Sequence, residues 1–489
     1  MREEGGMPDK LNLLFITTDE HRFDYLGFLG KVPVRTPTMD ALAAQGIFHP
    51  NAYSVNPLCM PSRCSWLTGL YSHQHGMNNN SGDLNRDLRT FPKALQKLGY
   101  FTALVGKEHF YEGNVDLVKA QPYTRQFGFD YLWSMGGKSM VGGTEDNWTY
   151  HLRKKGLINA YRHDLMRVRV VNNRENEPAP TFLKEEDTVD YLVAKKACEF
   201  LDGYTGAKPF FLHLSFCNPH FPHDPVAKYA EHYQEKDMPV PPGCPKNMVS
   251  YYQRHRAAYA ALCEQVDAYM GNVISKLKEK KLYDNTFIIF TSDHGHMLGD
   301  LGLTSKSHPY DGSARVPFIA AGKKIIKKPG TNNTAVENLD IVATFLEVAG
   351  APNVQEHLLE SPSKSLVPLW NGKKFKRKYA FSEEGYQFEK AYTMVCDGAW
   401  KYINFSFSGK EELYNLKKDP HEQKDLSKKE TKQVADMRKA LIHRLTVTPI
   451  PRPAEYIYTA TTGKHGKNPN QCFHKRLEDH VNTGILMME

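Results

Sequence analysis

The 489-residue sequence contains no apolar segment of the length that crosses a membrane as a helix. The start, Met1 to Pro8, lacks the apolar core of an export signal. The sequence as read therefore predicts a cytoplasmic protein, and a periplasmic or secreted one only if a leader was removed. The eight cysteines show no paired spacing, which argues against a disulfide framework and favours a reducing compartment. No internal repeat or nucleic-acid motif is evident, so we expect neither nucleic acid nor membrane as partners.

The charge excess is small, with a formal net charge of +8. Such an excess suits an anionic substrate, although an ordinary soluble surface accounts for it equally well. A chain of this length is too long for one ordinary domain and can bury a sizeable core. The composition turns basic and polar from Lys373 to Lys378. We therefore predict one domain over residues 8–375 and a C-terminal subdomain over residues 376–489.

The most informative stretch runs from Asn56 to Gly69 and reads NPLCMPSRCSWLTG. Pro61 suits the first turn of a helix and Gly69 suits its end. Cys59 is then expected just ahead of the helix, facing unpaired amide groups and the positive end of the helix dipole. Such a position favours an anion and can activate a nucleophile. Arg63, one turn further on, can reach back toward the same place.

Three interpretations of Cys59 compete. A lone cysteine near a helix cap is most often a small buried side chain. A phosphatase-type cysteine nucleophile requires an arginine six positions later, and Ser65 stands there, which excludes that class. The spacing of Cys59 and Cys64 does not fit a zinc knuckle. The third interpretation is a family resemblance, which depends on the rest of the chain.

Four nearly continuous apolar runs have the length of strands buried on both faces of a sheet, at residues 11–18, 99–105, 209–216 and 286–291. Polar side chains follow each run. Ligands bind at the carboxyl ends of strands in open α/β sheets. The candidate functional residues at these ends are Asp19, Glu20, Lys107, His109, His220, His223, Asp293 and His294.

Each of these groups also has a purely structural interpretation. A carboxylate pair after a strand is usually a solvated turn, although Asp19 and Glu20 could also bind a hard divalent cation. Lys107 and His109 are two apart and point the same way on an extended chain, yet a surface lysine beside a structural histidine gives the same pattern. The residues alone leave these alternatives open.

Cys59-x-Pro-Ser-Arg, followed by Leu67-Thr68-Gly69, resembles the signature of type I sulfatases. Further similarities follow in family order over residues 10–445: Gly-Lys-x-His at Lys107, Pro-His-x-Pro at His220, Asp293-His294, and Lys306 shortly after. The resemblance implies an α/β fold like that of alkaline phosphatase. Its central mixed, mostly parallel sheet would be flanked by helices and followed by a smaller C-terminal antiparallel sheet. Strands at 391–395 and 400–405 and a closing helix at 428–445 fit that subdomain.

The resemblance also implies a cofactor set. Cys59 would be oxidised to formylglycine by a formylglycine-generating or anaerobic maturase enzyme, and then hydrated. Ca²⁺, with Mg²⁺ as the alternative, would be held by Asp19, Glu20, Asp293 and His294. Most sulfatases have Asp-Asp at the first pair, so Glu20 departs from the pattern.

By the same resemblance, Lys107 and Lys306 would neutralise the sulfate oxygens and Arg63 would hold the hydrate. One hydroxyl of the hydrate would attack sulfur while His220 assists the leaving alcohol as acid. His109 would then take the proton of the other hydroxyl, so that sulfate is expelled. The predicted substrate contacts are Asn78 and His223.

The predicted function is hydrolysis of a sulfate monoester, on a small molecule or an oligosaccharide. A sulfated sugar is favoured by the basic, irregular stretch at 111–180, interpreted as a substrate-binding insertion, and by the basic tail. A solvated helix with scattered charge fits that stretch equally well. One alternative is a phosphonate monoester or phosphodiester hydrolase of the same superfamily, although phosphonate enzymes lack the counterparts of Lys107 and His109. The other is a non-catalytic sulfated-glycan binder.

Overall fold

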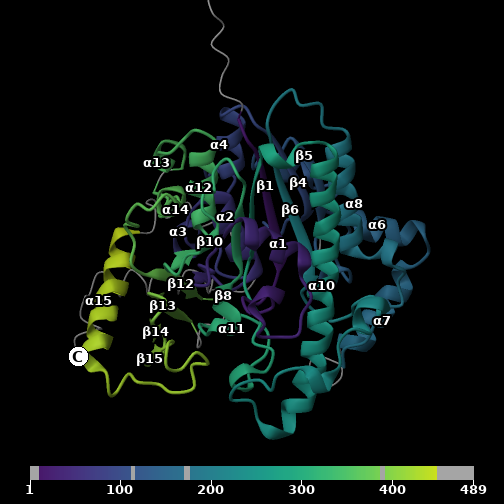
Figure 1. The fold of residues 1–489 in the computed structure, drawn as a ribbon. Coiled ribbons are helices and arrows are strands. Elements are labelled where there is room, and N and C mark those ends of the chain that lie inside the picture. Colours follow the sequence, from purple (N-terminus) through teal and green to yellow (C-terminus); the bar gives the residue numbers. More distant parts are fainter. Residues whose placement is uncertain (1–9, 112–115, 170–176, 359, 386–390, 449–489) are drawn as a thin grey trace, which may run out of the picture.

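The computed structural model describes residues 10–111, 116–169, 177–358, 360–385 and 391–448 (Figure 1). Its centre is an eight-stranded mixed sheet, parallel except where β9 pairs with β7 and with β2. In spatial order its strands are β10 (Gly330–Thr331), β2 (Ile47–Phe48), β9 (Phe318–Ala321), β7 (Thr286–Ser292), β1 (Asn12–Asp19), β6 (Phe210–Pro219), β4 (Phe101–Lys107) and β5 (Tyr131–Met135). The predicted fold class is confirmed.

The middle strand, β1, lies between β6 and β7 and is fully buried. Its side chains alternate between two hydrophobic layers, because successive residues of a strand point to opposite faces. Leu14 and Ile16 join the layer formed with α1 (Pro37–Gln45), α8 (Val189–Asp202) and α10 (Val249–Glu279). Leu13 and Phe15 join the layer formed with α2 (Cys59–Thr68), α4 (Phe91–Lys97) and α12 (Asp340–Val348). Helices thus cover both faces of the sheet (Figure 1).

Shorter elements connect these layers. A three-stranded sheet joins β3 (Ala52–Tyr53) to β8 (Arg315–Val316) and β11 (Val336–Glu337). The remaining short helices are α3 (Ser72–His75), α5 (Gln121–Arg125), α9 (Ala227–Ala230), α11 (Asp311–Ala314), α13 (Val354–His357) and α14 (Val367–Trp370). Every helix in the described part of the chain is too short or too polar to cross a lipid bilayer.

The stretch at 111–180 was interpreted as an irregular insertion, with a solvated helix as the alternative, and most of its described residues lie in regular elements. It contains β5, which pairs with β4 at the sheet edge, the short helix α5, and the longer helices α6 (Asn147–Lys154) and α7 (Ile158–Arg169). The Asp146 side chain caps α6 by accepting the Thr149 amide at 2.8 Å. Trp148 and Leu152 are buried in the α8 layer. In the sequence, the many polar residues of α6 and α7 make the few buried apolar residues difficult to recognise as a helical pattern.

The C-terminal antiparallel sheet has the order β12 (Ala380–Glu384), β13 (Tyr392–Cys396), β14 (Trp400–Phe405) and β15 (Glu411–Asn415). The closing helix α15 (Thr431–Val447) packs Val434, Met437 and Leu441 against it (Figure 1). The sequence indicated β13, β14 and α15 but gave no sign of β12. The basic tail from residue 449, taken as favouring a sulfated sugar, lies outside the described residues.

A buried ion cluster joins this sheet to the larger body. The Lys401 ammonium on β14 lies 2.5 Å from the Asp311 carboxylate and 2.6 Å from the Glu422 carboxylate. Replacing Lys401 by methionine should lower the free energy of unfolding by about 3–5 kcal/mol, because two buried carboxylates lose their partner. The urea midpoint at constant slope measures this effect.

Lys410→Met is the matched control for this prediction. Lys410 also pairs with a glutamate at 2.6 Å, but its side chain is 62% exposed. Its replacement should change the free energy of unfolding by only about 0–1 kcal/mol. Equal midpoints for the two variants would show that the buried cluster does not stabilise the junction.

Candidate active site

Helix α2 begins at Cys59 itself, and not at Pro61 as predicted. Leu58 is the extended cap residue, and Pro61 is the third helical residue. Proline is tolerated there because amide groups of the first turn have no partner within the helix. Cys59 is 1% exposed. Its sulfur therefore lies at the positive end of the helix, as the sequence indicated.

Two neighbouring parallel strands bring three more ligand groups to this sulfur. β1 ends with Asp19, and Asp293 and His294 follow β7, with Thr18 opposite Ser292 in the register. The carboxyl ends of parallel strands meet at one edge of the sheet, so these side chains converge. The Cys59 sulfur lies 3.1 Å from His294 Nε2 and 3.6 Å from Asp19 Oδ1. Ligand atoms of Asp19, Cys59, Asp293 and His294 all lie within 4.8 Å of one another, fully buried.

The charges in this cluster require compensation. Burial raises the pKa of Asp19, but the Lys107 ammonium and the other nearby cations hold it well below its usual value. Burial lowers the pKa of His294, but the Asp293 carboxylate outweighs this and brings it to about 9. Two carboxylates, an imidazole and the atom at position 59 fit a divalent cation, although they do not select between Ca²⁺ and Mg²⁺.

Arg63 lies behind the cluster, fully buried on α2. Its Nε donates to Asp293 at 2.9 Å, and its Nη1 donates to Ser215 Oγ at 2.9 Å and to the Lys107 carbonyl at 3.1 Å. Its Nη2 forms no hydrogen bond with any described residue and lies 3.8 Å from Asp19 Oδ2. A buried donor of this kind requires a partner, and an oxygen bound at position 59 would supply one.

Lys107 is the last residue of β4, and its ammonium forms an ion pair with Asp19. His109 has a left-handed backbone, with φ of 58°, so the extended-chain argument that placed it beside Lys107 is wrong. It still lies close enough for the two charges to interact. Burial and the Lys107 charge lower the pKa of His109 well below its usual value, which leaves the ring neutral. Its Nδ1 has no hydrogen-bond partner among the described side chains and backbone groups.

His220 and Lys306 meet at the edge of the same region. Strand β6 continues to Pro219, and His220 follows it. Lys306 Nζ lies 2.7 Å from His220 Nε2, whereas His220 Nδ1 lies 2.6 Å from the Phe221 carbonyl. Glu20 also faces this pair and is not a member of the four-residue ligand cluster.

The two remaining predicted contacts are placed differently. Asn78 is buried in the segment after α3. His223 lies with its Nδ1 3.0 Å from His255 Nδ1, and its ring packs against Tyr259 and His296. These contacts place His223 against α10, and a role in substrate binding stays a prediction for both residues.

Sequence reasoning missed the residues that support the cluster from behind. Ser54 and Ser62 donate to the Asp293 carbonyl at 2.5 and 2.8 Å, and Asn338 contacts the same oxygen at 3.4 Å. Ser62 lies within the Cys-x-Pro-Ser-Arg motif, so its position was a usable signal. Ser54 and Asn338 come from distant segments without any comparable motif.

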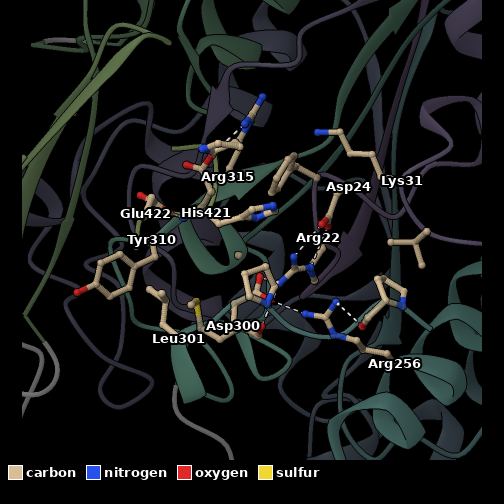
Figure 2. A pocket seen from close by; sticks show the side chains of 18 of the residues that line it. Arg22, Asp24, Lys31, Arg256, Asp300, Leu301, Tyr310, Arg315, His421 and Glu422 are labelled. Carbon is tan, nitrogen blue, oxygen red and sulfur yellow. Dashed lines mark hydrogen bonds and ion pairs between the residues drawn. The ribbon is translucent and has the colours of Figure 1, made fainter. Parts of the chain in front are cut away.

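A separate cavity of about 430 Å³ lies beyond the loop that follows His294. Figure 2 shows its paired charges: Arg22 contacts Asp24 and Asp300, and Arg256 also contacts Asp300. Its lining residues do not include Cys59 or the lysines and histidines described above. The cavity is therefore distinct from the metal-ligand cluster.

Comparison with solved structures identifies the fold. The solved structure of a putative sulfatase from Bacteroides fragilis has a TM-score of 0.75 with 24% identity, covering 93% of this chain and 99% of that one. A phosphonate monoester hydrolase from Agrobacterium radiobacter has a TM-score of 0.72 with 21% identity, covering 90% and 95%. At these identities the structures show the fold alone.

Sequence comparison identifies the family. The sulfatase family model matches residues 11–351, and the model of the C-terminal part of N-sulphoglucosamine sulphohydrolase matches residues 299–448. An arylsulfatase from Clostridium perfringens is 29% identical over 467 residues, covering 89% of this chain and 94% of that protein. An N-acetylglucosamine-6-O-sulfatase from Bacteroides thetaiotaomicron is 26% identical over 486 residues, covering 87% and 83%. The chain belongs to the sulfatase family and is a sulfuric ester hydrolase.

Proposed function

We propose that this enzyme hydrolyses a sulfate monoester carried by a carbohydrate, using formylglycine made from Cys59 and a divalent cation, Ca²⁺ or Mg²⁺. The observation that carries the proposal is the convergence of Asp19, Cys59, Asp293 and His294 at the start of α2. Formylglycine would supply the nucleophilic oxygen, and the bound cation would stabilise negative charge on it and on the sulfate. A maturase enzyme is the partner that this modification requires.

In this proposal the cation is held by Asp19, Asp293 and His294. Arg63 Nη2, which forms no hydrogen bond with a described residue, would donate to the oxygen at position 59 and so orient the nucleophile. Lys107, which pairs with Asp19 at the cluster, offsets the charge of the sulfate oxygens. His109, neutral and with an unoccupied Nδ1, accepts the proton whose removal releases inorganic sulfate.

In this proposal the leaving alcohol lies on the side of the sulfur opposite the attacking oxygen at position 59. Lys306 donates to the neutral His220, and the two together supply the proton that the alcohol takes up as it leaves. Asn78 and His223 complete the list of proposed substrate contacts. We further propose residues 8–375 as the catalytic domain and residues 376–489 as the C-terminal subdomain.

A carbohydrate substrate is supported by two similarities. The C-terminal match is to N-sulphoglucosamine sulphohydrolase, and one relative is named as an N-acetylglucosamine-6-O-sulfatase. Both names describe enzymes of sulfated amino sugars. A panel of sulfated saccharides, with release of inorganic sulfate as the readout, selects among sugars and positions.

Phosphonate monoester hydrolysis is the second candidate, because such an enzyme shares the fold. Lys107 and His109 favour the sulfate ester, because the Gly-Lys-x-His motif that holds them resembles that of sulfatases. Paired aryl sulfate and aryl phosphonate substrates separate the two candidates. We expect the ratio of the two kcat/KM values to favour the sulfate, and a ratio favouring the phosphonate would overturn the proposal.

Oxidation of Cys59 is the prediction that tests the proposed chemistry most directly. In an active preparation, mass spectrometry of the peptide that contains position 59 should show an aldehyde in place of the thiol. Cys64, on the same helix and fully buried, is the internal control and should remain a thiol. Full activity with only thiol at position 59 would contradict the proposal.

A further inference from the structure

Glu20 has an unusual backbone at the end of β1. Its φ is 70°, in the left-handed region that a glutamate rarely adopts. Two hydrogen bonds hold it there: its amide donates to Asp293 Oδ1 at 3.0 Å, and the Tyr259 hydroxyl donates to its carbonyl at 2.5 Å. The Arg22 amide in turn donates to the Tyr259 hydroxyl at 2.8 Å. The tertiary structure thus fixes a conformation that the local sequence disfavours.

In this conformation the Glu20 carboxylate lies beside Lys306, His220 and His296. Its Oε2 lies 3.3 Å from Lys306 Nζ and 3.4 Å from His220 Nε2. Its Oε1 lies 3.8 Å from His296 Nε2, and the residue is 2% exposed. The ligand atoms that converge within 4.8 Å come from four other residues.

We propose that Glu20 is a positioning residue that orients the Lys306–His220 pair toward the leaving alcohol, and that it is not a metal ligand. The inference rests on the proposed sulfatase mechanism. An aspartate at this position, which the sulfatase pattern would supply, is shorter by one methylene. The additional methylene is what brings a carboxylate to Lys306 from the end of β1.

Hydrogen-bond counting supports this role. A lysine ammonium has three N–H donors. One is directed to His220 at 2.7 Å and a second to Glu20 at 3.3 Å. The third is left for the substrate oxygen, and its direction is fixed by the other two. Without Glu20 the ammonium is held by a single contact and can rotate.

The test uses Glu20→Gln and Glu20→Asp on a series of aryl sulfates, from 4-nitrophenyl to 4-methoxyphenyl sulfate. The nitrophenolate leaves with little protonation, whereas the methoxyphenolate requires a positioned acid. Both variants should lose roughly 10²-fold in kcat on the methoxyphenyl ester and much less on the nitrophenyl ester. Bound cation, measured by elemental analysis, should equal that of the parent protein.

Three outcomes would overturn the inference. An equal loss across the ester series with loss of bound cation, rescued by Glu20→Asp, would make Glu20 a metal ligand. An unchanged dependence on the leaving group would show that Glu20 has no role in orienting the pair. A parent protein that binds the cation but releases inorganic sulfate from neither the aryl esters nor the sulfated saccharides would overturn the proposed function as well. Glu231→Gln, at an exposed position, controls for the amide substitution.

Discussion

Replacing Asp293 by alanine should abolish both the bound divalent cation and the release of sulfate. The Asp293 carboxylate accepts from Arg63 Nε and from the amides of Glu20 and His294. Its removal deletes one metal ligand and leaves the buried Arg63 guanidinium without its carboxylate partner. We expect kcat/KM to fall on the order of 10³-fold, and elemental analysis to find no stoichiometric metal.

Asp284→Ala is the matched control for that experiment. Asp284 precedes β7, whereas Asp293 follows it. The Asp284 side chain is 66% exposed. This control should keep the metal content and the activity of the parent protein. Unfolding by heat should be compared for both variants, so that a folding defect is recognised. Parent-level metal in a folded Asp293→Ala protein would reject Asp293 as a ligand.

The second large effect is expected at His109 and Lys107. His109→Ala should release about one equivalent of aryl alcohol per site in a rapid burst and then almost none, because the step that expels sulfate lacks its base. Lys107→Met should lose the burst as well, since the Lys107 charge is needed for the first attack on sulfur. Stopped-flow absorbance with 4-nitrophenyl sulfate measures both, and mass spectrometry of the stalled protein should find a sulfo group at position 59.

His163→Ala controls for the loss of an imidazole, because His163 is exposed on α7. It should turn over at the parent rate. If the His109→Ala variant also turned over steadily near that rate, His109 would have only a structural role. Such a result would remove the argument that His109 makes for sulfate and would reopen the phosphonate alternative.

The convergence of the site could be predicted because it follows from strand polarity. The four apolar runs were recognisable as buried strands, and parallel strands deliver the residues that follow them to one edge of the sheet. Asp19, Lys107 and Asp293 therefore had to lie near one another once the runs were identified. Cys59 could be added because proline and glycine bracket a helix in the sequence.

Details that depend on side-chain direction could not be predicted in this way. His223 follows the same strand as His220, yet it packs against His255 on α10. His109 has a left-handed backbone, so alternation along an extended chain gave the wrong reason for its position. β12 was missed because its strand conformation depends on pairing with β13, which the local sequence does not show.

The sequence by itself determined the fold class, the family and which side chains gather at one edge of the sheet, because apolar periodicity and ordered motifs are local properties of the chain. Only the tertiary structure decided where Glu20 points. Its left-handed backbone is held by Tyr259, and its carboxylate is met by Lys306, from two segments more than 200 positions away. Contacts between such distant segments depend on packing of the whole chain, and no local pattern encodes them.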